Sequence, residues 1–245
     1  TVSLTNQVID VLKSGEPRPV VAPASYTYEI VATTYTIADA YTASGDGSAP
    51  ATVETTWSYP RFTLWDGSTT SALESINADL RNSCEFDASA AAEWDFDTQL
   101  MQTDYHEDKV MSISGNIASV LCVRNETAGG VHGFDGSYGK FFDLSTGDEL
   151  TAYDALGTTE DELAFKGKAA IRAFLADNPS DLEVTESDIE GYATDMSRYV
   201  RDDKGIFIIT RSYELGSYAF GSHRIYVVSN DGGSSFTGTE VDLGH

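Results

Sequence analysis

Basic residues are the scarcest chemical class in this sequence. Lys and Arg together number 15 among 245 residues, against 39 Asp and Glu, and the formal net charge is −24. Nucleic acid binding needs a basic footprint, so nucleic acid is excluded as a partner, and a bare anionic membrane surface is disfavoured. Two interpretations of the acidity remain open: it attracts a cationic partner at a raised association rate, or it only keeps the chain soluble.

The chain also lacks a long hydrophobic run. Its longest apolar candidate, 117–123, has the length of a strand, well short of the roughly 18 residues that cross a bilayer. We therefore expect no membrane insertion by this segment. Because the chain begins at Thr1 and is rich in Thr, Ser, Tyr, Asp and Gly, we expect an exported protein whose signal or anchor segment was removed, or a trimmed chain.

Cysteine is almost absent, since the chain has only Cys84 and Cys122, 38 positions apart. No CxxC spacing occurs, so the sequence has no zinc or redox motif of that kind. In an exported protein we predict that the two cysteines form a disulfide. The alternative is a pair of buried free thiols.

Catalytic motifs are missing as well. The four histidines, His106, His132, His223 and His245, form no HExxH pattern, and neither a P-loop nor a GxSxG elbow is present. Paired carboxylates for glycoside hydrolysis remain open, because 39 acids offer many pairs by chance. We predict no metal, no cofactor and no enzymatic activity.

Periodicity predicts an α+β fold. Strand-like segments precede and flank helical ones without strict alternation, which favours antiparallel sheets with helices packed on one face over a doubly wound parallel sheet. Thr159 with Glu162, and Thr185 with Asp188, have the spacing of helix N-terminal capping boxes. We expect strands at 25–37, 52–64, 110–124, 138–144, 198–211 (a hairpin) and 223–229, and helices at 71–82, 88–101, after Thr159 and after Thr185.

The predicted organisation has four parts. An irregular leader covers 1–24, a first α+β subdomain 25–106, a second subdomain 107–230, and a flexible tail 231–245. No short-period repeat of the solenoid kind is present.

Three ordered groups of segments carry a family resemblance. They are Tyr59-Pro60 with Ile76-Asn77; the run 128–133 (AGGVHG) with 142–147 (FDLSTG) and 154–156 (DAL); and the run 213–221 (YELGSYAFG). Over roughly residues 25–230 they resemble the extracellular domain of the RsiV anti-sigma factors and the domain that accompanies the peptidoglycan deacetylase PdaC. Ser212 and Ser217 stand where the family often has proline.

The resemblance implies two α+β subdomains, the second similar to a small lobe of the actin and Hsp70 ATPase fold. It also implies export to the cell envelope, as a secreted protein or an anchored lipoprotein. In RsiV the domain is a receptor for lysozyme. We therefore expect a non-catalytic extracytoplasmic binding or sensing module that recognises a cationic protein such as lysozyme, or peptidoglycan. The alternative is an accessory domain or enzyme of peptidoglycan modification.

The expected binding residues are Tyr213, Glu214 and Tyr218, with Gly130 and His132 in the neighbouring glycine-rich turn. Tyrosine is a favoured anchor at protein interfaces, and an acid beside it suits a basic partner. The alternative is a structural corner between two strands, whose tyrosine hydroxyls bond to the backbone.

Overall fold

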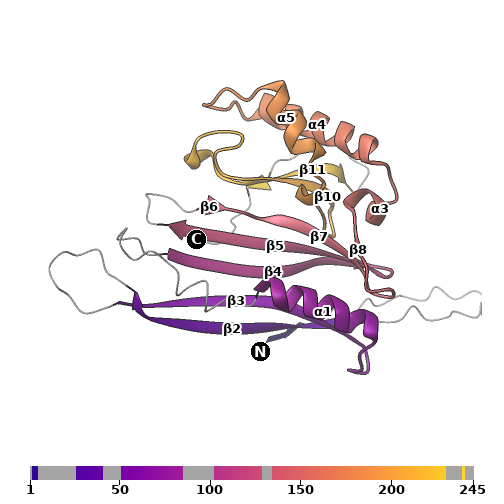
Figure 1. Cartoon of the computed structure of the whole chain (residues 1–245). Helices are drawn as coiled ribbons and strands as arrows, with labels where there is room; N and C mark the ends of the chain where they lie inside the picture. Colours follow the sequence, from indigo (N-terminus) through magenta and orange to yellow (C-terminus); the bar gives the residue numbers. More distant parts are fainter. Residues whose placement is uncertain are drawn as a thin grey trace, which may run out of the picture.

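A computed structural model describes residues 2–4, 26–40, 51–84, 102–128, 134–229 and 239–240, with side chains for 26–34, 57–84, 106–124 and 136–228. Two β-sheets and a set of helices form the described part of the chain, which confirms the α+β class (Figure 1). The second helix expected, at 88–101, lies outside the described residues, as do most of the leader and the tail.

The larger sheet has eight strands in the order β1-β2-β3-β4-β5-β7-β8, with β6 paired to β5. All its described pairs are antiparallel, as expected, except β3 with β4, which are parallel and make the sheet mixed. The chain between β3 and β4 includes α1, and a connection of that length lets the next strand enter in the same direction. The bounds are β1 Val2–Leu4, β2 Tyr26–Ala40, β3 Ala51–Leu64, β4 Gln102–Ser114, β5 Ile117–Ala128, β6 Phe134–Asp135, β7 Tyr138–Asp143 and β8 Glu149–Leu150.

The smaller sheet is antiparallel, in the order β12-β11-β10-β9. Its bounds are β9 Tyr199–Arg201, β10 Gly205–Thr210, β11 His223–Ser229 and β12 Thr239–Glu240. The hairpin expected at 198–211 is the β9–β10 pair, in which Asp202 Oδ1 accepts from the amides of Lys204 and Gly205 and so closes the turn.

The helices are α1 Ser71–Cys84, α3 Ala152–Leu156, α4 Glu160–Asp177 and α5 Glu186–Thr194, with single 3₁₀ turns at η2 Met196–Arg198 and η3 Tyr218–Phe220. The predicted capping residues begin α4 and α5. Thr159 accepts a hydrogen bond from the Glu162 amide, and Thr185 forms a full capping box with Asp188.

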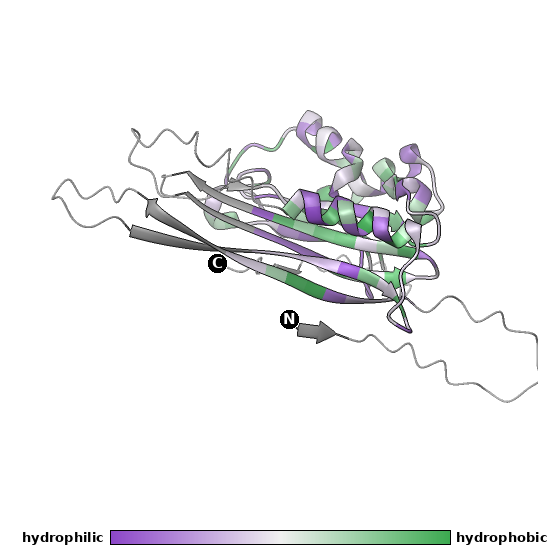
Figure 2. Cartoon of the chain, turned by 60° about the horizontal axis from the view of Figure 1, so that its bottom comes forward, coloured by the Kyte–Doolittle hydropathy of each residue, from purple (hydrophilic) through white to green (hydrophobic). Residues whose placement is uncertain are grey.

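Three apolar cores hold these layers together. The first lies between α1 and one face of the larger sheet, and includes Leu73, Ile76, Leu80, Val120 and Phe142. Leu121 and Val123 on the opposite face of β5 pack against Val200, Phe207 and Ile209 of the smaller sheet. The third core packs the outer face of that sheet against α4 and α5. Each sheet is therefore covered by helices on one face, and α1 alternates hydrophobic and hydrophilic residues around its axis (Figure 2).

The predicted boundary between the subdomains, at 106/107, falls inside β4. Strand β4 pairs with β3 on one side and with β5 on the other, so hydrogen bonding in the larger sheet continues across that position. The likeness of the second part to an actin or Hsp70 lobe stays a prediction.

Candidate recognition loop

The connection between β10 and β11, residues 211–222, forms a compact loop. Its ends meet at Ser212, whose amide donates to Ser222 Oγ at 3.0 Å, and the two hydroxyl groups lie 3.2 Å apart. Leu215 is buried beneath the loop, and at Gly216 a Cβ atom would meet the Phe220 ring at 2.4 Å. The loop is therefore packed by its own side chains, which is typical of Ω-loops.

Ser212 and Ser217 both donate a hydrogen bond through the backbone N–H. Ser212 closes the loop as described, and the Ser217 amide donates to Asp181 Oδ1 at 2.8 Å. Proline has no N–H and could make neither bond. These two backbone hydrogen bonds therefore help to fix the loop, and proline at either position would remove one of them.

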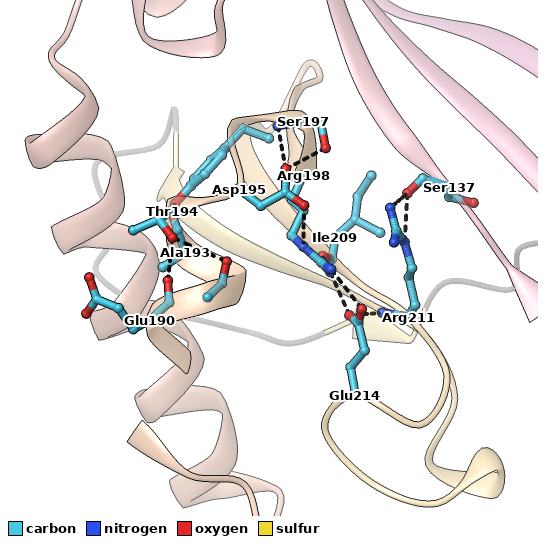
Figure 3. Close-up of polar contacts among 12 residues, drawn as sticks. Ser137, Glu190, Ala193, Thr194, Asp195, Ser197, Arg198, Ile209, Arg211 and Glu214 are labelled. Atoms are coloured by element: carbon cyan, nitrogen blue, oxygen red, sulfur yellow. Dashed lines mark hydrogen bonds and ion pairs between the residues drawn. The ribbon is translucent and has the colours of Figure 1, made fainter. Parts of the chain in front are cut away.

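Glu214 anchors the loop to the body of the protein (Figure 3). Arg198 donates to both carboxylate oxygens, with Nη1 2.6 Å from Oε2 and Nη2 2.8 Å from Oε1. The Arg211 amide donates to Oε2 at 2.7 Å. This bidentate arrangement is the strongest geometry for a charged pair, and both oxygens of Glu214 are engaged inside the protein.

Arg198 is buried, with 7% of its surface exposed, and it collects further partners. Its Nε donates to Asp195 Oδ2 at 3.1 Å, its Nη1 also donates to the Ile209 carbonyl at 3.3 Å, and its guanidinium lies over the Tyr192 ring at 5.0 Å. Burial pushes the pKa of Arg198 down, but Glu214 and Asp195 outweigh it and the net shift is upward. The base of the loop is a satisfied, charged network.

Tyr213 is the most exposed aromatic residue of the loop. Its side chain is 56% exposed, and its φ of 69° lies in the left-handed region, where it is the only described non-glycine residue with positive φ. Its ring centroid lies 5.5 Å from that of the half-buried Tyr218. A left-handed tyrosine costs roughly 1–3 kcal/mol and persists only where its surroundings impose it.

The predicted binding residues therefore have different roles. Tyr213 and Tyr218 lie side by side at the surface, and Glu214 is an internal anchor whose carboxylate is engaged by Arg198. Gly130 and His132 lie outside the described residues, so their placement beside the loop stays a prediction. Sequence reasoning missed Arg198, which is 16 positions from its partner and belongs to no local motif.

A second polar cluster lies at the C-terminal end of α1. Asp108 of β4 has no exposed surface, and its Oδ1 accepts from Arg124 Nη1 at 2.7 Å. Cys84 donates to Asp108 Oδ2 at 3.3 Å, and Cys122 is the cross-strand neighbour of Asp108 in the β4–β5 pair. Arg124 also lies over the Tyr138 ring at 5.4 Å.

Both cysteines are free thiols in the structure, so the disulfide is not the state observed. They are nevertheless neighbours, because both reach Asp108. Burial, reinforced by Asp108, raises the pKa of Cys84 to about 12 and that of Cys122 well above its usual value. Both shifts favour the protonated thiols, and Cys84 is a hydrogen-bond donor in this form.

His106 stacks on Trp57 beside this cluster, with ring centroids 4.0 Å apart. Burial and the nearby Arg124 charge lower its pKa to about 4. The side chains that the structure describes contain no group of three or more His, Cys, Asp or Glu residues that could hold a metal ion.

Solved structures of DUF3298 family proteins are among those similar to this chain. A DUF3298 family protein from Pseudomonas aeruginosa aligns with a TM-score of 0.53 and 11% identity, over 84% of this chain and 91% of that one. A DUF3298 family member from Bacteroides fragilis aligns with a TM-score of 0.50 and 15% identity, over 85% and 92%. The chain shares their fold. No family model matches the sequence, and no curated protein does.

Likeness at this identity concerns the fold alone. The structural neighbours are DUF3298 family proteins, while the specific resemblance to RsiV stays a prediction. Within the described residues, no helix is both long and apolar enough to pass through a membrane.

Proposed function

We propose that this chain is a non-catalytic, extracytoplasmic recognition module that binds a cationic protein through the β10–β11 loop. The observation that carries the proposal is Tyr213: a large aromatic side chain held exposed, in a strained backbone conformation, by a buried ion pair beneath it. Strain of this kind concentrates at functional sites.

The loop has the properties of a rigid contact surface. Tyrosine supplies contact area at a low cost in conformational entropy, and aromatic anchors carry much of the binding energy at interfaces. The bonds from Ser212, Ser217 and Glu214 fix the loop before a partner arrives, which lowers the entropic cost of association.

Charge gives the class of partner. With a net charge of −24, the molecule attracts cations and repels anions, and this field acts before contact. A basic protein of the lysozyme kind, as the family resemblance suggests, is therefore the partner to test first.

The test is surface-immobilised binding of the purified chain to a basic lysozyme at several salt concentrations. We expect affinity to weaken as salt rises, chiefly through a slower association rate, because exposed charges are screened over about 8 Å at physiological ionic strength. Absence of binding at low salt, or an affinity that ignores salt, would refute the proposal.

Variants locate the contact. Tyr213→Ala and Tyr218→Ala should each raise the dissociation rate about tenfold or more, in the range of an interface anchor. The matched control is Phe165→Ala, which removes a 70% exposed aromatic side chain from α4 and should leave binding unchanged. If the tyrosine variants only lower the melting temperature and bind normally once folded, the loop is a structural corner.

A further inference from the structure

Two cysteine thiols lie beside the buried carboxylate of Asp108, and the C-terminal residue of α1 supplies one of them. Cys84 ends the helix and donates to Asp108, while Cys122 faces Asp108 directly across the β4–β5 ladder. Both cysteines are almost fully buried, at 3% and 0% exposure. Two side chains that lie beside one carboxylate are close in space, although 38 positions separate them in the chain.

We propose that Cys84 and Cys122 form a reversible thiol–disulfide couple that locks the end of α1 to β5. Oxidation joins the two sulfur atoms by one S–S bond. The oxidant is a small or protein disulfide: it receives the two electrons and two protons that the cysteines lose, and it leaves as two thiols. Reduction by a dithiol or by two small thiols reverses each of these changes.

Asp108 makes the two states unequal. In the reduced protein this fully buried carboxylate accepts from the Cys84 S–H group as well as from Arg124, and Cys122 lies beside it across the strand pair. The disulfide has no S–H, so oxidation removes the Cys84 donor and leaves Arg124, and a buried acceptor that loses a donor is destabilised. The reduced form is favoured by that difference, which makes the disulfide easier to reduce than a permanent structural one.

Burial controls the rate. The thiolate is the reactive species, and the raised pKa of each thiol keeps its population very small in the folded protein. A reagent reaches the sulfurs only when the last turn of α1 leaves the sheet. Disulfide formation is therefore slow, so it follows prolonged contact with an oxidant and not brief contact.

The experiment equilibrates the full chain with glutathione at different ratios of its reduced to its oxidised form. Products are followed by intact mass and by thiol titration in denaturant. We expect a monomeric product that is lighter by two hydrogen atoms and has no free thiol. Cys84→Ser and Cys122→Ser each keep one thiol, and neither should give this product. Two free thiols, mixed disulfides with glutathione or disulfide-linked dimers from the unmodified chain at strongly oxidising ratios would overturn the proposal.

Asp108→Asn tests the role of the carboxylate. For half reduction this variant should need an about tenfold higher ratio of the squared concentration of reduced glutathione to the concentration of oxidised glutathione, which corresponds to about 30 mV. An unchanged ratio would overturn the role assigned to Asp108. Hydrogen exchange on the unmodified chain gives a readout that does not depend on folding of the variant: the amides of the last turn of α1 should exchange more slowly in the disulfide form. Equal exchange in both forms would contradict the lock.

Discussion

Replacing Glu214 by Gln separates an anchoring role from direct contact with a partner. The change keeps the shape of the side chain and leaves Arg198, which is buried, without its bidentate partner. Loss of one member of a buried pair costs about 3–5 kcal/mol. Asp195 stays on Arg198 and the Glu214 side chain is 17% exposed, so we expect the lower end, about 3 kcal/mol.

Urea and thermal unfolding measure this cost directly. For a chain of this size, 3 kcal/mol corresponds to a fall in melting temperature of about 6–12 °C. The control is Glu190→Gln, which removes an exposed ion pair with Lys168 and should cost less than about 1 kcal/mol. Equal costs for the two variants would refute the assignment of Glu214 as the anchor. A normal melting temperature combined with lost partner binding would instead make Glu214 a contact residue.

Three further predictions concern stability. Folding lowers the pKa of His106 from 6.5 to about 4, so between these pH values the unfolded chain binds a proton at His106 and the folded chain does not. The free energy of unfolding should therefore fall by about 1–2 kcal/mol between pH 6.5 and 4, and His106→Phe should remove most of that fall. An unchanged pH profile in the variant would contradict this. Gly139→Ala should prevent folding or cost more than about 3 kcal/mol of stability, because its Cβ would lie 2.3 Å from the Tyr199 carbonyl oxygen. The control, Gly191→Ala on α5, places a Cβ where nothing lies within 4 Å and should be neutral or stabilising. Similar melting temperatures for the two variants would count against the packing described. Thr185→Ala should cost about 1 kcal/mol in urea unfolding by removing the capping box, and no loss would show that the cap is dispensable.

Local signals in the sequence were sufficient for much of the fold. The capping residues Thr159 and Thr185 began helices as expected, the Asp202–Gly205 turn closed a hairpin, and α1 extends two residues beyond its predicted end at 82. Each of these depends on residues within a few positions of one another, where propensity and spacing carry the information.

The rest depends on contacts between distant residues. The parallel pairing of β3 with β4 follows from where α1 docks, and no short motif encodes it. Glu214 looked like a surface acid because its partner, Arg198, lies on the other side of β10 in the sequence. Tyr213 and Tyr218 were expected to bind a partner because tyrosine is a favoured interface anchor, and that role stays a prediction. The left-handed backbone of Tyr213 has no local sequence signal.

The parallel β3–β4 junction has a mechanical consequence. Each half of the larger sheet contains a long antiparallel hairpin, β2–β3 and β4–β5, but only two residue pairs register across the described junction, Trp57 with His106 and Ser58 with Glu107. A pulling force across the sheet would therefore open it along this line before unzipping either hairpin. Cys84 bridges this junction, since its thiol lies within hydrogen-bond distance of the Ser58 carbonyl on β3 and of Asp108 on β4. The end of α1 therefore links the two strands where their own pairing is short.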